Sequence, residues 1–175
     1  MKFILTNHDE LTEKQLYNIA NIKSQHWVYP IDSQIDWIQN VYKKSDTHIF
    51  LMDNDVLIGY VAIAEISIVA DEKNLNVFGI SCLCVDKRYL NNGYGSLIME
   101  RALRFAKDNE KSICLLCKEK LVRFYERCGY VAINPKNIFV EQSNYNYKLM
   151  IYDGIKNNEI ETLIRAQNIS IDRNF

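Results

Sequence analysis

The chain has 175 residues, of which 48% are hydrophobic, so it can bury a sizeable core within the usual size of one domain. Its 21 basic and 22 acidic residues are interspersed and give a formal net charge of −1. A protein that binds a phosphate backbone needs a basic excess, so the composition argues against a nucleic-acid partner. We therefore expect a single domain over residues 1–175.

Neither a membrane span nor an export signal is indicated by the sequence. The longest apolar run, 56–64, is far shorter than the roughly 20 residues that cross a bilayer, and it is typical of a buried strand. The N-terminus becomes acidic at Asp9 and Glu10, and no apolar stretch there leads to a cleavage site of small residues. We expect a cytoplasmic protein that does not contact a membrane.

Five cysteines are present, an odd number without a disulfide-like framework, which favours a reducing compartment. Cys82 and Cys84 together with Cys114 and Cys117 would make four thiolate ligands for zinc. In a strand, however, Cys114 and Cys117 would face opposite sides of the sheet. We predict small buried apolar residues and no metal site.

The first half of the chain mixes helix and strand signals. Thr12 and Gln15 have the spacing of a capping box, which predicts a helix start, and apolar residues after Pro30 recur at helical spacing. A turn at 53–55 separates two β-rich runs. The expected order is a strand at 2–5, a helix from Thr12, a second helix after Pro30, and strands at 49–52, 56–68 and 75–85, the last two separated by a bend at 71–74.

The second half begins with a glycine-containing loop and an amphipathic helix from Gly95. Further elements are expected as a strand at 112–117, a helix at 119–128 ending at Gly129, strands at 130–133 and 145–152, and a helix at 157–168. The summed order predicts a mixed α/β sheet covered by helices, with one strand-loop-helix unit at its centre.

The loop of that central unit, residues 91–96, has the features of an anion-binding turn. Gly93 and Gly95 allow the backbone to approach a ligand closely, and the first amides of the following helix have no partner within the helix. A pyrophosphate would suit these donors and the helix dipole, although a tight turn without a ligand explains the glycines equally well. Neither Rossmann nor Walker spacing is present, so the pattern supports neither nucleotide fold.

Two segments together carry a family resemblance. Residues 85–95, with the sequence VDKRYLNNGYG, resemble the acyl-CoA pyrophosphate loop of the GNAT acetyltransferases, and residues 124–130, FYERCGY, look like the family's aromatic-Tyr-x-x-x-Gly-aromatic signature. The resemblance implies a mixed, mostly antiparallel central sheet flanked by helices, with a splayed cofactor cleft. It also implies acetyl-CoA as co-substrate.

The resemblance assigns acetyl-CoA to two segments. Backbone donors at the end of the strand before the loop would hold the pantetheine arm, and the loop would hold the pyrophosphate. Leu90 stands where the family has Arg or Gln, so main-chain amides would carry the contact. The predicted cofactor-binding residues are Leu83, Cys84, Val85, Leu90, Asn91, Asn92, Gly93, Tyr94, Gly95 and Ser96.

The family resemblance assigns the catalytic residues less directly than the cofactor-binding residues. By resemblance, Tyr125 would meet the departing thiolate as general acid, although its helical face would also suit a core residue. The family's usual acidic residue or histidine is missing before the loop, and Glu65 is the candidate base, with an exposed position on the outer face of the sheet as the alternative. The three histidines have no evident cluster and are expected at the surface or in caps. Trp27, Tyr29 and Trp37 are expected to fill the core, with the lining of a substrate cleft as the alternative.

The expected reaction is N-acetylation: a primary amine attacks the thioester of acetyl-CoA directly, through a tetrahedral intermediate. A small molecule resembling an aminoglycoside or a polyamine is the preferred acceptor, and the protein would act as a monomer or homodimer. A protein N-terminus or lysine is the alternative acceptor. The competing hypothesis to an enzyme is a non-catalytic acyl-CoA-binding regulatory domain.

Overall fold

A computed structural model describes residues 1–141, 147–152 and 158–173 of the chain. The chain divides into two compact units, the first made of Met1–Ala64 and Ser81–Ala102 and the second of Glu65–Ile80 and Leu103–Phe175. Three elements continue from one unit into the other: strand β3 (Val56–Ala70), strand β4 (Lys73–Val85) and helix α3 (Tyr94–Asp108). The prediction of a single domain stays a prediction.

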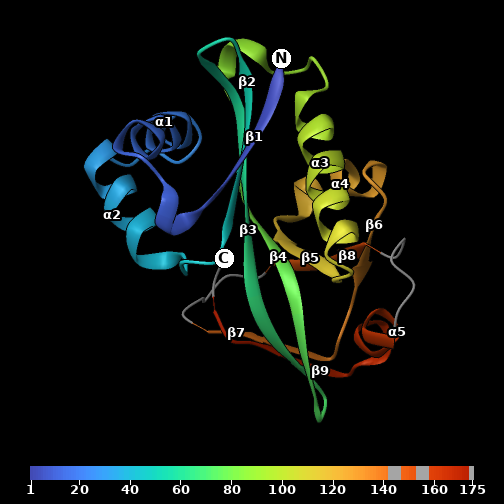
Figure 1. Cartoon of the computed structure of the whole chain (residues 1–175). Coiled ribbons are helices and arrows are strands. Elements are labelled where there is room, and N and C mark those ends of the chain that lie inside the picture. Colours follow the sequence, from blue (N-terminus) through green and yellow to red (C-terminus); the bar gives the residue numbers. More distant parts are fainter. Residues whose placement is uncertain (142–146, 153–157, 174–175) are drawn as a thin grey trace. The chain divides into compact units, whose positions relative to one another are not determined.

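The first unit contains an antiparallel sheet in the order β1-β2-β3, followed by the end of β4 (Figure 1). Strand β1 (Lys2–Asn7) pairs with β2 (Thr47–Asp53), which pairs in turn with β3. The short 3₁₀ helix η1 (His8–Glu10) and helices α1 (Glu13–Ser24) and α2 (Ile31–Val41) complete the unit with the first part of α3. The capping box is confirmed, since Thr12 accepts from the Gln15 amide and the Gln15 side chain accepts from the Thr12 amide.

Two layers of helix enclose the sheet of the first unit. Apolar residues of α1 and α2, among them Ile19 and Ile38, form one core cluster with Phe50 and Tyr60. On the other face, Gly59 makes room for α3, because a Cβ atom there would overlap the Ile98 side chain and lie 3.1 Å from the Cys84 carbonyl oxygen. The alternation of side chains along β3 thus fixes α1 and α2 on one face and the start of α3 on the other.

The aromatic residues around the first two helices are more exposed than expected. Trp27, Tyr29 and Trp37 are 39%, 65% and 38% exposed, so the prediction that they fill the core is wrong. The reason is that α1 and α2 present their aliphatic residues to the sheet. Trp37 instead receives the ammonium group of Lys23, whose Nζ lies 3.5 Å from the ring centroid.

The second unit holds the remaining strands in the order β4-β5-β8-β6, with β9 pairing with both β3 and β7. The β4–β5 and β7–β9 pairs are parallel, whereas β5–β8, β6–β8 and β3–β9 are antiparallel. The elements are β5 (Ile113–Cys117), η3 (Glu119–Leu121), α4 (Val122–Arg127), β6 (Tyr130–Ile133), β7 (Asn137–Val140), β8 (Lys148–Tyr152), α5 (Asn158–Arg165) and β9 (Asn168–Ile171). The predicted mixed, mostly antiparallel sheet flanked by helices is confirmed, and the strands of the described residues do not close into a barrel.

Several element boundaries differ from the sequence prediction. Strands β7 and β9 were not predicted; the second of them occupies Asn168, where the last helix was expected to end. The expected helix at 119–128 is a 3₁₀ turn followed by the short helix α4, which ends just before Gly129 as expected, and Gly129 has a φ of 86°. Residues 145, 146 and 157 of two predicted elements lie outside the described residues.

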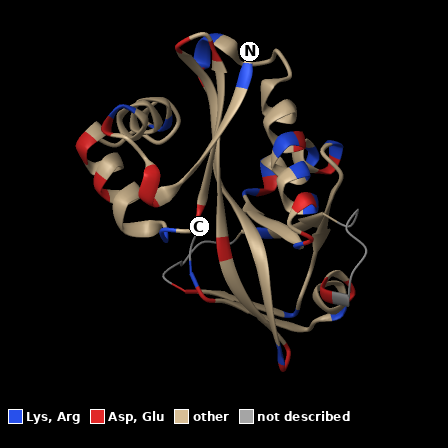
Figure 2. Ribbon diagram, viewed as in Figure 1, with Lys and Arg blue, Asp and Glu red and all other residues tan. Residues whose placement is uncertain are grey.

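The described part of the chain shows how its charged residues are distributed and whether any helix is suited to cross a membrane. Acidic and basic positions are interspersed along the ribbon (Figure 2). None of the described helices has the length and apolar character that a membrane crossing requires.

Candidate active site

The glycine loop lies between the end of β4 and the start of α3, within the first unit. A 3₁₀ turn, η2 (Lys87–Tyr89), opens it, and Asn91 and Gly93 follow with φ angles of 64° and 79°. The Asn92 side chain donates to the carbonyls of Tyr89 and Leu90 at 3.3 and 3.2 Å. These bonds stabilise a backbone that turns twice through the left-handed region before α3 begins at Tyr94.

This loop fits a pyrophosphate group. A Cβ atom on Gly93 would meet nothing within 4 Å, so the space beside the turn is open. The Leu97 amide bonds the Gly93 carbonyl at 3.1 Å and closes the first turn of α3, whose earlier amides have no acceptor within the helix. Open space and a positive helix end together suit an anion, which the main chain of residues 90–96 would hold.

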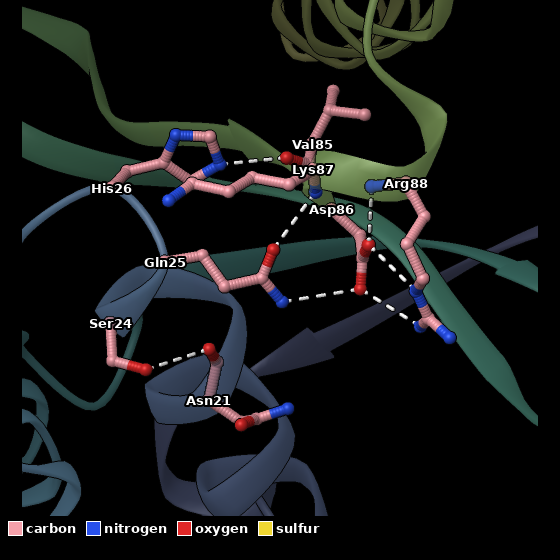
Figure 3. Close-up of polar contacts among 8 residues, drawn as sticks. All are labelled: Asn21, Ser24, Gln25, His26, Val85, Asp86, Lys87 and Arg88. Carbon is pink, nitrogen blue, oxygen red and sulfur yellow. Dashed lines mark hydrogen bonds and ion pairs between the residues drawn. The ribbon is translucent and has the colours of Figure 1, made fainter.

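A buried carboxylate anchors the start of the loop (Figure 3). Asp86 is 5% exposed and accepts hydrogen bonds from the amide, Nε and Nη2 of Arg88 at 2.9, 3.0 and 2.9 Å. The Gln25 side chain, at the end of α1, donates to Asp86 Oδ2 and accepts from the Lys87 amide. The Asp86 amide itself donates to the Ile58 carbonyl of β3. One side chain therefore joins α1 to the loop while its backbone joins the loop to the sheet.

The same contacts set the ionisation of this carboxylate. Hydrogen bonds from the Arg88 side chain are the largest cause, and they outweigh partial burial and lower the pKa of Asp86 to about 2. The ionised form is thus the one that the folded loop stabilises.

The end of β4, where the pantetheine arm is predicted to bind, has an irregular backbone. Cys82 has a φ of 54°, a left-handed conformation that is unusual for a residue with a side chain. Leu83 after it is half-buried, whereas Cys84 and Val85 are buried. His26 Nε2 lies 2.7 Å from the Val85 carbonyl oxygen, and because a carbonyl only accepts, this nitrogen carries a proton (Figure 3). The cofactor-binding assignment of these residues stays a prediction.

Two histidines occupy positions that the sequence did not suggest. His48, in β2, is fully buried, and its Nε2 lies 3.0 Å from Nδ1 of the half-buried His8. Its other nitrogen, Nδ1, lies 2.6 Å from the Tyr60 hydroxyl. The expectation that these histidines are isolated surface or capping residues is wrong, because strand pairing and η1 bring them together over β3.

Hydrogen bonds continue from Tyr60 toward β4. Tyr60 bonds Tyr42, whose hydroxyl lies 2.9 Å from Ser81 Oγ, and Ser81 donates to Cys82 Sγ at 3.4 Å. We call this set the histidine–tyrosine network. Its members are His8, His48, Tyr60, Tyr42, Ser81 and Cys82.

Burial keeps the network neutral. Desolvation, with smaller contributions from the charges of His8 and Lys23, lowers the pKa of His48 to about 3. It also raises the pKa values of Tyr42 and Tyr60 well above the usual range. Lys23 lies beside the network, is 3% exposed, has its pKa lowered by burial and bonds Cys82. The network thus contains groups that exchange protons readily but resist holding a charge.

The two predicted catalytic residues belong to the second unit. Tyr125 is buried in α4, and its ring contacts those of Phe124 and Tyr130. Glu65 is half-exposed in β3 and pairs with Lys111, with 2.9 Å between Oε1 and Nζ. Each position agrees with the structural alternative given for it, and both catalytic roles stay predictions.

Comparison with known proteins decides the family. The sequence model described as Acetyltransferase (GNAT) family matches residues 13–130, about two thirds of the chain. The chain belongs to the GNAT acetyltransferase family. The loop and the Tyr125 segment both lie within the matched region.

Individual relatives are distant. Escherichia coli ElaA is 19% identical, with a TM-score of 0.63 over 86% of this chain and 97% of ElaA. An aminoglycoside 6′-N-acetyltransferase complexed with coenzyme A is 15% identical, with a TM-score of 0.60 over 85% of this chain and 93% of that enzyme. These structures share the GNAT fold. A protein of Amsacta moorei entomopoxvirus, named as a candidate glycylpeptide N-tetradecanoyltransferase, is 23% identical over 135 residues, which are 73% of this chain and 44% of the viral protein. The GNAT chain thus spans less than half the length of that curated relative.

Two parts of the site do not follow from the motifs. Asp86 belongs to the loop motif, but an acidic residue directly after a buried strand and two positions before an arginine is also a signal for a local cap. His48 opens the apolar run of β2, where a polar residue needs a buried partner. Its partners come from segments 12 and 40 residues away, so nothing local reveals them.

Replacing Asp86 with Asn should make the stability of the protein less dependent on pH. The lowered pKa of Asp86 stabilises the fold at pH values above about 4, and this contribution is lost as the pH falls toward 2. We expect Asp86→Asn to lower the free energy of unfolding by about 2 kcal/mol at pH 6 and by progressively less below pH 4. Urea unfolding between pH 6 and pH 3 measures the difference.

The titration of His48 changes the free energy of unfolding of wild type and of Asp86→Asn equally, so it cancels in the difference between them. Lys87→Gln is the control, because the Lys87 amide and not its side chain bonds Gln25. A difference between wild type and Asp86→Asn that is constant from pH 6 to pH 3 would contradict the assignment.

Two substitutions of Gly93 separate backbone strain from ligand space. Ala tolerates a φ of 79° poorly, whereas Asn adopts the left-handed region more readily but places a larger side chain in the open space. We expect Gly93→Ala to be less stable than Gly93→Asn by about 1 kcal/mol in urea unfolding. Gly93→Asn should weaken acetyl-CoA binding at least as much as Gly93→Ala in calorimetric titration. Unimpaired acetyl-CoA binding by Gly93→Asn would show that the open space is not the ligand site.

Proposed function

We propose that this GNAT protein transfers the acetyl group of acetyl-CoA to the primary amine of a small molecule of the aminoglycoside or polyamine type. The observation that carries the proposal is the loop at the start of α3, with open space beside Gly93 at the N-terminal end of a helix, where a pyrophosphate would bind. Charge supports a small acceptor only weakly, since acidic and basic residues are balanced over the chain.

Each predicted residue would have a task in this reaction. Acetyl-CoA supplies a thioester carbonyl, and the amides of Leu90 to Ser96 would hold its diphosphate. Backbone donors of Leu83 to Val85 would orient the pantetheine arm and the carbonyl. The Tyr125 hydroxyl would donate to the departing sulfur, and Glu65 remains a candidate for accepting the amine proton.

A second acceptor class has support from one relative. The poxviral protein is named for transfer of a 14-carbon acyl group to a glycylpeptide, so a peptide N-terminus and a longer acyl chain are the alternative to a small amine and acetyl. The match covers 44% of that protein, and we therefore keep acetyl-CoA as the first donor to test.

Thiol release decides among these functions. The purified chain is incubated with acetyl-CoA or tetradecanoyl-CoA and, in turn, an aminoglycoside, a polyamine, a glycyl peptide and a lysine peptide. Release with acetyl-CoA and a small amine supports the proposal, and release only with tetradecanoyl-CoA and the glycyl peptide supports the alternative. Measurable acetyl-CoA binding without thiol release for any pair would indicate a non-catalytic binding domain.

Tyr125→Phe should lower kcat by about 10- to 100-fold and leave the Kd of acetyl-CoA nearly unchanged, because only the group donated to the leaving sulfur is removed. Tyr130→Phe is the matched control, since the buried Tyr130 hydroxyl has no hydrogen-bond partner among the described residues. Turnover numbers from the thiol assay and Kd values from titration measure the two effects. Equal rates for wild type and Tyr125→Phe would make Tyr125 a core residue only.

A further inference from the structure

The histidine–tyrosine network is a chain of hydrogen-bonded side chains with a buried middle and two partly exposed ends. Its two terminal residues, His8 and Cys82, are both partly exposed. The residues between them are buried, with exposures between 0 and 6%. Continuous hydrogen bonds connect the ends: His8 to His48, His48 to Tyr60, Tyr60 to Tyr42, Tyr42 to Ser81, and Ser81 to Cys82. A network that served only to satisfy core polar groups would not need two accessible ends.

We propose that this network carries the proton of the attacking amine from Cys82 to His8, which releases it to water. The inference rests on the proposed acyl transfer and names the route of its proton. The six members act as relay residues, and no single one of them is the base.

The place of Cys82 in the strand connects the network to the reaction. Cys82 directly precedes Leu83, the first of the residues whose backbone is predicted to orient the acyl arm. Its left-handed backbone interrupts the regular strand at this point. Ser81 and Cys82 therefore bring the network to the segment of β4 at which an amine would attack.

The hydrogen bonds allow a balanced transfer. In the structure Ser81 donates to Cys82 Sγ, so transfer starts once the Ser81 hydroxyl has rotated to donate to Tyr42. Every donor then points toward His8: Tyr42 donates to Tyr60, Tyr60 to His48 Nδ1, and His48 Nε2 to His8 Nδ1. The amine proton arrives at Cys82 Sγ as the thiol proton moves to Ser81 Oγ, and each following donor passes its own proton one step. Afterwards every bond has reversed, Ser81 donates to Cys82, and His8 is an imidazolium that bonds the Gln39 carbonyl as well.

Charges around the network favour His8 as the exit. Burial lowers the pKa of His8, and the charges of Asp46 and Asp9, which face it, raise it. Burial has the larger effect, so the pKa of His8 stays below its usual value. A proton that reaches His8 therefore passes on to water. Lys23 faces His48 from α1, Cys82 faces both tyrosines from β4, and Cys84 faces Tyr60. No buried member is a stable site for the charge, which suits transfer and not storage.

The first test needs no substrate. Nitrogen NMR of the histidine side chains should show His48 neutral from pH 5 to 8, with the proton on Nε2 and Nδ1 accepting a hydrogen bond. Tyr60→Phe should shift the Nδ1 resonance to that of an unbonded nitrogen. Tyr130→Phe should leave it unchanged. A His48 that titrates with a normal pKa, or an Nδ1 signal indifferent to Tyr60→Phe, would overturn the relay.

The second test uses the pH profile of kcat/KM for the best amine. Tyr60→Phe and Tyr42→Phe should each lower kcat/KM about 100-fold at pH 7, with unchanged Kd for acetyl-CoA. The loss should shrink toward pH 10, where more of the amine is already deprotonated. Tyr130→Phe should follow the wild-type profile. A merely structural role would give a loss that does not depend on pH.

The outcomes separate the two proposals. Absence of thiol release by the wild-type protein with every amine overturns both the proposed function and the relay. An active wild type whose Tyr60→Phe variant shows no loss, or a constant loss at every pH, overturns the relay alone. If Glu65→Gln shows the pH-dependent loss and Tyr60→Phe does not, the amine proton leaves through Glu65.

Discussion

The buried carboxylate of Asp86 holds together the segments from which the candidate site is built. It accepts from Arg88 and Gln25, and Gln25 in turn accepts from the Lys87 amide, so the end of α1 and the start of the glycine loop share one set of hydrogen bonds. The low pKa keeps that carboxylate charged under all ordinary conditions. The loop backbone is therefore already arranged before a ligand arrives, which reduces the entropy lost on binding.

Much of this architecture follows from local sequence patterns. The Thr12–Gln15 capping box, the glycine loop before α3 and the end of a helix just before Gly129 each depend on residues close together in the chain, and each is found as predicted. Strands β7 and β9 were missed because they are four residues long and gain their stability by pairing with distant segments. Propensity over so short a window carries little information.

The site was predictable only where a motif marks it. Two glycines and an aromatic signature sufficed to assign the family, which the match over residues 13–130 confirms. The histidine–tyrosine network has no such marker, because His48 finds its partners through the registers of β1, β2 and β3. No local pattern distinguishes His48 in the sequence, and it becomes part of a polar cluster only once three strands and two helices have assembled around it.

The cysteines have a consequence for a protein of a thioester-using family. Thiol–thioester exchange needs a thiolate, and a reactive thiolate would capture the acyl group in place of the acceptor. Burial raises the pKa of Cys84 well above its usual range, that of Cys114 to about 12 and that of Cys117 to about 11. These three thiols stay protonated near neutrality, so the fold protects the protein from acylating itself at those positions.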